Sequence, residues 1–486
     1  MRLLSNRRRG DPAHWAATAL SLPGWLRAGV AFLLLGIAAL IASDMVEQQT
    51  WWVHGAWCIS GLLMAAPVLG VALRAGFALV LRDHLVMFMG AFALYFLFGS
   101  SLLALGPEQD IVAALSYYPV NAQMALRVDA VNAIGFGIAL MTATLSPRGW
   151  FQRQADRVAR AASRVSALKV MVVLMALGAG ALLNTLSVDV GLREGMVSGT
   201  WRAVARFSVV AIYLGSSYRG RHQRALRAVA VLIAGTEAFG GLLQFNKTEM
   251  LLPLAALTAG LSVRYGARKV LPGGLVLLAG LFFTSAGVVS FGRNTLGANS
   301  GTSIADRWAV LREGFSASRS NDDAAAYSTW ARLCYVPSEG AALDFYDTGM
   351  GGDDLRLIPW LFVPRVLAPD KPIITQTSAE FHTKISGNEG SSTGQGVFAS
   401  GYYNAGWPGV LLASVLCGWL LAQTSAIANA IFLRQALLLL PFALLGVYMA
   451  FRIDGHFVGD YLGAFILILY PLVAGSFVLA VRNMHR

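Results

Sequence analysis

The sequence contains few cysteines and few charged residues. Its three cysteines, Cys58, Cys334 and Cys417, lie far apart in the 486 residues, so their spacing predicts neither a disulfide framework nor a Cys-x-x-Cys metal site. The seven histidines form no His-Glu-x-x-His motif, and we expect no metal. Glycine-rich nucleotide fingerprints and P-loops are also missing, which argues against ATP hydrolysis and leaves no predicted cofactor.

Apolar residues dominate the composition. They make up 56% of the chain and charged residues 13%, whereas soluble domains have roughly 25% charged residues. Backbone polar groups in lipid must pair within their own segment, so long apolar runs predict helices, each of about 20 residues. We expect an all-α polytopic membrane protein with about twelve transmembrane helices. The runs lie near residues 26–43, 52–73, 84–105, 127–146, 168–185, 201–216, 225–244, 248–263, 270–290, 405–424, 435–451 and 460–481.

Positive charge is concentrated on one side of this predicted bundle. The formal net charge is +12. Alternating spans place both chain termini and the basic clusters on the cytoplasmic side, which is the positive-inside pattern. The basic segment 152–169 is typical of a helix lying on anionic lipid headgroups. We therefore expect membrane lipid, and no nucleic acid, as a partner.

One long polar insertion divides the predicted spans. Residues 1–290 hold nine predicted helices, residues 291–404 form a large outer loop, and residues 405–486 hold the last three helices. A membrane protein with so many polar residues between two spans usually works on that side of the membrane. We therefore expect the active face on the outer, periplasmic side.

The insertion has helical and irregular parts. Ser303 precedes apolar residues at helical spacing, which predicts an amphipathic helix. A second helix containing Trp330 is expected to end before Pro337. Residues 344–354 are acidic and rich in glycine and predict a loop. The prolines within residues 357–372 forbid a straight helix there.

The last predicted outer turn places Arg452, Asp454 and His456 within five residues. A cation, an acid and an imidazole between two apolar helices are suited to substrate binding and proton transfer. Cations at the boundary of water and lipid are also suited to a phosphate or pyrophosphate, because their hydrogen bonds strengthen as water is excluded. Each of them could instead extend to lipid headgroups. Further cations of this kind are Lys247, Arg293, Arg356, Arg365 and Lys371.

Glu237 lies within the seventh predicted helix. A carboxylate is costly in lipid, so we expect it to face the interior of the bundle or a cavity. Two roles remain open for it, a proton pathway and a hydrogen bond that packs helices together.

Two segments resemble a known family. Residues 359–372 read Pro-Trp-Leu-Phe-Val-Pro-Arg-Val-Leu-Ala-Pro-Asp-Lys-Pro, and residues 401–409 read Gly-Tyr-Tyr-Asn-Ala-Gly-Trp-Pro-Gly as the chain enters the next span. This pair is similar to the outer loop of bacterial O-antigen and oligosaccharide repeat-unit polymerases of the Wzy type. The resemblance covers roughly residues 240–460.

The resemblance implies an inner-membrane glycosyltransferase of the metal-independent GT-C kind. Such an enzyme moves a growing glycan from undecaprenyl pyrophosphate to the non-reducing end of the next lipid-linked repeat unit, in company with a flippase and a chain-length regulator. Arg365 and Lys371 fall in the first matching segment, and Tyr403 and Asn404 fall in the second. Lys247 stands where these polymerases often carry an arginine, and a lysine lacks the planar donor fork.

These residues suggest a division of roles. Arg365, Lys371 and Arg452 would stabilise the charge that develops on the leaving pyrophosphate. His456, Asp454 or Glu380 would accept the proton of the acceptor hydroxyl. An O-antigen ligase, which transfers glycan to lipid A-core, uses the same donor and is the main alternative enzyme. A flippase would need charged residues through several helices, and within the predicted spans Glu237 is nearly alone.

Overall fold

The computed structural model describes residues 22–75, 82–147, 149–193, 199–296, 303–317, 329–363, 367–368, 370–387, 392–466, 468–469, 473 and 475–476. All regular secondary structure within these ranges is helical. The chain divides into two compact units. Unit 1 comprises Met1–Arg160, Tyr327–Gln435 and Phe442–Arg486, and unit 2 comprises Ala161–Ala326 and Ala436–Pro441.

Eight helices in the described ranges are long and apolar enough to cross a membrane. The prediction of an all-α, multi-pass membrane protein is thereby confirmed. Three further predicted runs form shorter apolar helices, Phe207–Ser217, Leu437–Phe451 and Phe457–Ile466. The eight long helices are Gly24–Met45, Trp51–Gly70, His84–Leu105, Ala122–Leu145, Ala167–Asp189, Gln223–Leu243, Lys269–Val289 and Val397–Leu433.

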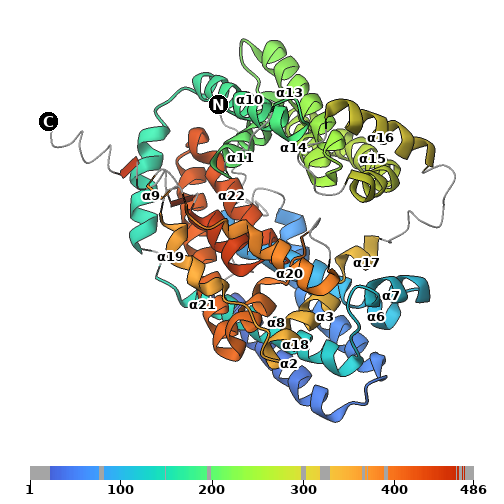
Figure 1. Ribbon diagram of the computed structural model, residues 1–486. Coiled ribbons are helices and arrows are strands. Elements are labelled where there is room, and N and C mark those ends of the chain that lie inside the picture. Colours follow the sequence, from blue (N-terminus) through green and yellow to red (C-terminus); the bar gives the residue numbers. More distant parts are fainter. Residues whose placement is uncertain are drawn as a thin grey trace. The chain divides into compact units, whose positions relative to one another are not determined.

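Unit 1 holds the first four long helices and most of the C-terminal third of the chain (Figure 1). Two of its helices, α9 and α22, extend two residues past its bounds. Its elements are α2 (Leu22–Met45), α3 (Trp51–Ala75), α5 (His84–Phe92), η1 (Ala93–Gly99), α6 (Leu102–Leu105), α7 (Glu108–Leu115), α8 (Ala122–Leu145), α9 (Gly149–Ala162), α17 (Thr329–Leu333), α18 (Val336–Asp347), η2 (Asp354–Leu357), α19 (Ile358–Leu361), η3 (Ile374–Gln376), α20 (Thr377–Ser386), α21 (Val397–Leu433), α22 (Leu440–Phe451) and η5 (Phe457–Leu462).

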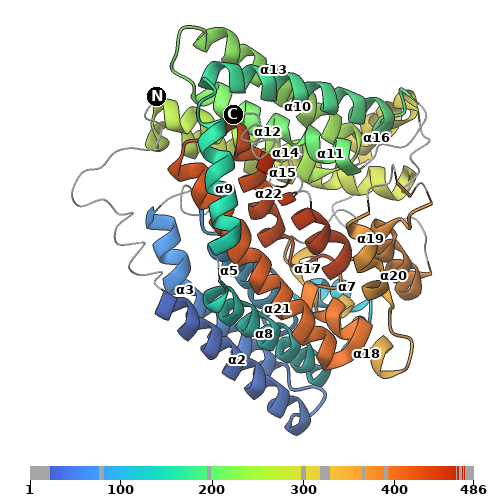
Figure 2. The same cartoon turned by 90° about the vertical axis from the view of Figure 1, so that its left-hand side faces the viewer.

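The centre of unit 1 is the packing of α8 against α2 and α21 (Figure 2). Phe136 on α8 stacks on Phe92 with ring centroids 3.9 Å apart and meets Phe32 of α2 edge-on at 5.0 Å. Small residues let the backbones approach: a Cβ on Gly29 would lie 2.9 Å from the carbonyl oxygen of Gly137. Close backbone approach of this kind is typical of helix pairs in membranes, where dispersion replaces the hydrophobic effect. Of these helices, α21 also contacts α18 and η5, which border the polar cavity described below.

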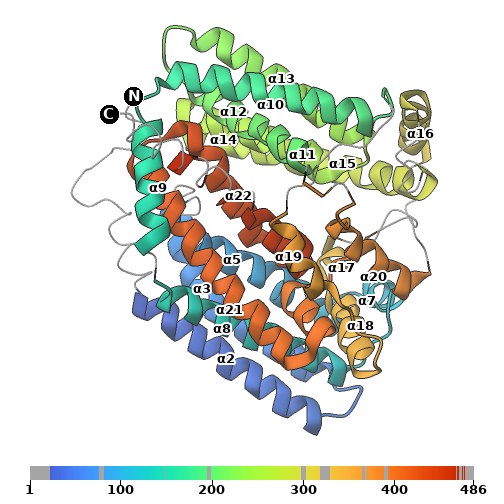
Figure 3. The same cartoon turned by 60° about the vertical axis from the view of Figure 1, so that its left-hand side comes forward.

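The long helix α21 is two helical segments joined by a sharp turn (Figure 3). Ala405 and Gly406 depart from helical geometry, and Gly406 has φ +62°, which glycine adopts at little cost. The two segments lie against each other, because a Cβ on Gly401 would come within 2.6 Å of the carbonyl oxygen of Gly409. Residues 397–403 are buried on all sides. Hence α21 begins at a short buried helix, ahead of the span predicted from residue 405.

Unit 2 is a bundle of helices in which α14 contacts α12, α13 and α15. Glu237 on α13 is buried there, and its Oε2 accepts a hydrogen bond of 2.7 Å from Oγ of Ser208 on α12. The carboxylate faces the interior as expected, and the contact is a hydrogen bond that packs two helices. The elements are α10 (Ala167–Asp189), α11 (Gly199–Ala205), α12 (Phe207–Ser217), α13 (Gln223–Leu243), α14 (Lys247–Tyr265), α15 (Ala267–Leu296), α16 (Ile304–Ala317) and η4 (Leu437–Leu439).

The polar insertion contributes helices to both units. The predicted amphipathic helix is α16, and Ser303 caps it: its Oγ accepts from the backbone N–H of Asp306 at 3.2 Å, and the Asp306 carboxylate accepts from the backbone N–H of Ser303 at 3.1 Å. The second predicted helix is the short α17. The prediction of a loop over residues 344–354 is wrong for its first residues, because α18 continues to Asp347.

Candidate functional site

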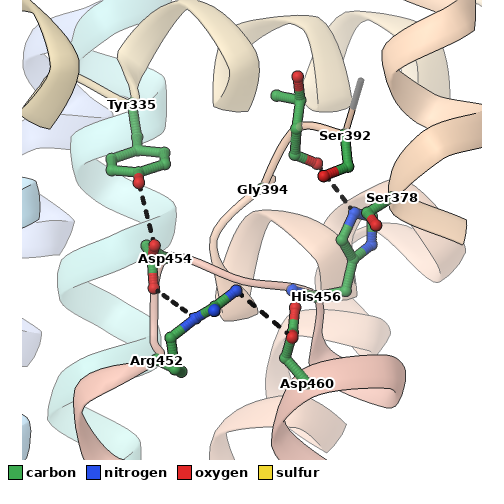
Figure 4. Close-up of a pocket in the computed structure, with 9 residues that line it drawn as sticks. Tyr335, Ser378, Ser392, Gly394, Arg452, Asp454, His456 and Asp460 are labelled. Atoms are coloured by element: carbon green, nitrogen blue, oxygen red, sulfur yellow. Dashed lines mark hydrogen bonds and ion pairs between the residues drawn. The ribbon is translucent and has the colours of Figure 1, made fainter. Parts of the chain in front are cut away.

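A polar cavity of about 290 Å³ lies in unit 1 (Figure 4). Four segments that are far apart in the sequence meet there: the N-terminus of α18, helix α20, the chain leading into α21, and the turn between α22 and η5. The last of these segments supplies most of the ionisable groups. The lining residues are Tyr335, Ser378, Ser392, Thr393, Gly394, Arg452, Asp454, His456 and Asp460.

Main-chain hydrogen bonds fix this turn against the chain that enters α21. The N–H of Gly396 donates to the carbonyl of Asp454 at 3.0 Å, and the N–H of Val397 donates to the carbonyl of Ile453 at 2.9 Å. These bonds satisfy N–H groups at a helix N-terminus that have no partner within the helix. They also hold the ionisable turn next to residues 392–394.

The chain after the turn continues as η5, a π-helix. Such wide helical turns are rare in proteins, and those that occur often lie at functional sites. His456 precedes the first turn of η5, and its backbone N–H donates to Oδ2 of Asp460 at 3.0 Å. Asp460, which lies within η5, therefore satisfies the backbone N–H of the residue before the helix and also forms part of the cavity wall.

Arg452 is held between two carboxylates (Figure 4). Its Nε lies 3.3 Å from Oδ1 of Asp454, one terminal nitrogen lies 3.4 Å from Oδ1 of Asp460, and the other donates to the hydroxyl of Tyr448 at 3.1 Å. Burial lowers the pKa of Arg452, but the charges of Asp460 and Asp454 raise it by more than burial lowers it. The pKa is therefore above its ordinary value, and the guanidinium remains charged. Each of its three nitrogens thus faces an acceptor of the protein, but the contact of Nε with Asp454 is an ion pair without hydrogen-bond geometry.

Asp454 also binds Tyr335, whose hydroxyl donates to Oδ2 of the carboxylate at 3.0 Å. Burial, and then the charge of Asp454, raises the pKa of Tyr335 well above its ordinary value, so the phenol remains a donor. Burial raises the pKa of Asp454 too, although Arg452 and the hydrogen bond from Tyr335 oppose this shift.

His456 is buried, with 2% of its surface exposed. Its Nε2 lies 3.1 Å from the carbonyl oxygen of Thr393. A carbonyl can only accept, so Nε2 must carry the proton, and the lone pair of the neutral ring is on Nδ1. The Nδ1 atom has no hydrogen-bond partner. Burial lowers the pKa of His456, so near pH 7 the imidazole is neutral and able to accept a proton.

Asp354 acts on His456 through its charge. The buried Asp354 carboxylate favours the protonated imidazole, which partly offsets the effect of burial on the His456 pKa. Asn404 holds Asp354 in place: Oδ1 of Asn404 accepts from the Asp354 backbone N–H at 2.6 Å, and Nδ2 donates to the Asp354 carboxylate at 3.4 Å. The neighbouring Tyr403 is buried, and its hydroxyl accepts from Nζ of Lys384 at 2.6 Å. Tyr403 and Asn404, the two site residues predicted in the segment 401–409, therefore lie outside the cavity lining, and Asn404 acts on the site through Asp354.

A second polar network supports Thr393. The hydroxyl of Tyr117, which follows α7, is hydrogen-bonded to the Thr393 hydroxyl and lies 2.9 Å from Nδ1 of His382. The same Nδ1 lies 2.7 Å from the Thr393 hydroxyl. Burial lowers the pKa of His382, so this ring is neutral as well. The network fixes the residue whose carbonyl orients His456.

Three other predicted site residues lie in unit 1 outside the cavity lining. Nζ of Lys371 donates to the carbonyl of Val363 at 2.9 Å. Arg356 is exposed and forms an ion pair of 2.7 Å with Asp353. Glu380 is exposed on α20.

Three more predicted cations are placed differently. Arg365 lies outside the described residues, and so does the side chain of Arg293 on α15. Lys247 belongs to unit 2, where its Nζ lies 4.9 Å from the ring centroid of Phe282. This is cation–π geometry.

The sequence prediction missed Asp460, Tyr335, Thr393 and His382. Asp460 had a visible signal, since an acid interrupts an apolar run four residues after His456. The other three carry no local signal, because only the tertiary fold brings α18, α20 and residues 392–394 to the same place.

Among the described residues, one group could supply three metal ligands: His54, Cys58 and Asp129, all buried between α3 and α8. Nδ1 of His54 is already bonded to the Asp129 carboxylate at 2.6 Å, and Nε2 lies 2.9 Å from the carbonyl of Ser100. Nε2 must therefore carry a proton, and Nδ1 is already directed at the Asp129 carboxylate, so neither ring nitrogen is free for a shared ion. The group fits a buried hydrogen-bonded pair better than a metal site.

No known protein family, curated protein or solved structure matches the chain.

Proposed function

We propose that the chain is a membrane-embedded polysaccharide polymerase. It transfers a growing glycan from undecaprenyl pyrophosphate to the non-reducing end of an incoming lipid-linked repeat unit. The observation that supports this most directly is His456, a neutral imidazole that lines a polar cavity, has a fixed tautomer, and has a buried Nδ1 without a hydrogen-bond partner. A base of this kind is suited to an acceptor hydroxyl.

The bond changes balance without another reactant. The acceptor oxygen attacks the anomeric carbon of the donor glycan, its proton moves to Nδ1 of His456, and the bond from the anomeric carbon to the pyrophosphate oxygen breaks. The pyrophosphate leaves with the electron pair. Fixed cations nearby would stabilise this leaving group more than any proton donor.

In this proposal the leaving pyrophosphate is bound by cations outside the cavity. Arg452 is committed to Asp454 and Asp460, so a pyrophosphate there would have to compete with both carboxylates. Arg356 is exposed and its ion pair is worth little in water, which makes its guanidinium available. In this proposal Arg356 and Lys371 meet the pyrophosphate, together with Arg365.

The topology that goes with this function has twelve spans, both termini in the cytoplasm, and residues 291–404 in the periplasm of a bacterium. The basic clusters on alternate connections support it. Alkaline phosphatase fused after residue 388 should be active, and the same enzyme fused after residue 220 should be inactive. The reverse result would overturn the orientation and the periplasmic active face. A flippase and a chain-length regulator are the expected partners.

The direct test is polymer formation by the purified protein in proteoliposomes that contain lipid-linked repeat units. The wild-type protein should give a ladder of chain lengths on a gel, and His456→Gln should lose activity by about 10²-fold or more. His222→Gln, which changes an exposed histidine of unit 2, is the matched control. Transfer to lipid A-core in place of repeat units would identify a ligase. Movement of the lipid without bond formation would identify a flippase.

A further inference from the structure

The charged groups that line the cavity sum to a negative charge. Asp454 and Asp460, both paired with Arg452, contribute two negative charges, Arg452 contributes one positive charge, and the buried His456 is neutral near pH 7. Figure 4 shows Arg452 between the two carboxylates, with Tyr335 and His456 to either side. An anion that approached the guanidinium would meet both carboxylates at nearly the same range, and their repulsion would exceed the attraction of one cation.

The cavity is better equipped to accept hydrogen bonds than to give them. One terminal nitrogen of Arg452 donates to the hydroxyl of Tyr448, its other two nitrogens form ion pairs with Asp454 and Asp460, and the hydroxyl of Tyr335 donates to Asp454. Among the buried atoms of the lining, two acceptors have no hydrogen-bond partner, Oδ1 of Asp454 and Nδ1 of His456, against one donor, Nε of Arg452. An ionised carboxylate can accept about four hydrogen bonds. An occupant with several donors therefore complements these walls.

The size of the cavity limits this occupant. Its volume of about 290 Å³ is just below the roughly 300–1,000 Å³ that is usual for small-molecule pockets. This is room for one sugar ring and too little for a whole repeat unit. Vicinal hydroxyls, or the ammonium group of an amino sugar, supply donors at suitable spacing.

We propose that this cavity binds the terminal sugar of the acceptor through its hydroxyl or ammonium donors, and that the donor pyrophosphate binds elsewhere. Identification of that sugar as the acceptor rests on the proposed function. The preference for donor-rich, neutral or cationic ligands over anions rests on the cavity alone.

Binding to the purified full-length protein tests the preference directly. The probes are the methyl glycosides of glucose, galactose and glucosamine, and inorganic pyrophosphate, titrated by calorimetry. At least one glycoside should bind, and pyrophosphate should not displace it. Asp460→Asn should weaken glycoside binding by about tenfold, because it replaces a charge-assisted acceptor by a neutral one. Glu108→Gln, an exposed acid of α7 outside the cavity, should bind as the wild type does.

Three results would overturn the proposal: no glycoside binds, pyrophosphate competes with the glycoside, or Asp460→Asn binds the glycoside as tightly as the wild type. Thermal unfolding shows whether Asp460→Asn is folded. If it is not, Asp454→Asn takes its place, and the competition experiment on the wild type decides in either case. The proposed function fails separately, when the wild type binds glycosides but forms no polymer.

Discussion

The carbonyl oxygen of Thr393 lies 3.1 Å from Nε2 of His456, and this contact determines which nitrogen of the imidazole is basic. Without it the ring could exchange tautomers and carry its lone pair on Nε2. The chain leading into α21 is therefore as important to the proposed chemistry as the histidine itself.

Asp354→Asn should move the acid limb of the pH–rate profile to lower pH. The proposed reaction needs the neutral imidazole, so its rate should fall as the pH drops through the His456 pKa, which burial places below its ordinary value. Asp354 opposes that shift, because its charge stabilises the imidazolium. Removing the charge lowers the pKa further. Polymer formation measured between about pH 4.5 and 8 checks this, and an acid limb that stays in place or moves to higher pH contradicts it.

Arg452→Ala should reduce both stability and activity. It leaves Asp454 and Asp460 facing each other across the cavity without their shared cation. Loss of one partner from a fully buried ion pair costs about 3–5 kcal/mol, and the partial exposure of these side chains brings the expected cost to about 1–3 kcal/mol. Thermal unfolding in detergent measures it.

A double variant separates this role from substrate binding. Asp460→Asn should recover part of the lost stability when combined with Arg452→Ala, since one of the repelling charges is then gone. If Arg452 serves only the substrate, the single variant will unfold at the wild-type temperature and the second change will recover nothing.

Tyr117→Phe should lower activity severalfold with a stability cost of about 1 kcal/mol, the usual net worth of a hydrogen bond. The change removes the hydroxyl that contacts both Thr393 and His382, whose direct contact with each other remains. Tyr118→Phe is a matched control, because the Tyr118 hydroxyl donates to Asp344 at 2.5 Å and does not line the cavity. Equal activities for the two variants would show that the network does not support the site.

Gly401→Ala should lower the amount of folded protein in the membrane. The added methyl group would lie 2.6 Å from the carbonyl oxygen of Gly409, so the two segments of α21 would have to separate. Gly235→Ala tests the same substitution in helix α13, where nothing lies within 4 Å of the new atom. That control should be neutral or up to about 1 kcal/mol more stable. A normal level of the Gly401→Ala protein would show that the close contact is dispensable.

The fold class followed from hydropathy because lipid forces long apolar runs to be helical. The turn that carries Arg452, Asp454 and His456 could also be predicted from hydropathy, because charged residues interrupt an apolar stretch there. Tyr335 and Thr393 could not be predicted, since they reach the cavity through hydrogen bonds between residues distant in the sequence. The early start of α21 was hidden too, because a short helix rich in Tyr and Gly resembles an interfacial loop.

The pairing of residues 396–397 with residues 453–454 has a consequence for biogenesis. The ribosome releases Gly396 and Val397 long before Ile453 and Asp454 exist, and these are the carbonyls to which their N–H groups donate. The cavity can therefore assemble only after the last helices have been delivered to the bilayer. A nascent or truncated chain could therefore carry the early spans without this cavity, so the proposed activity would require the last helices.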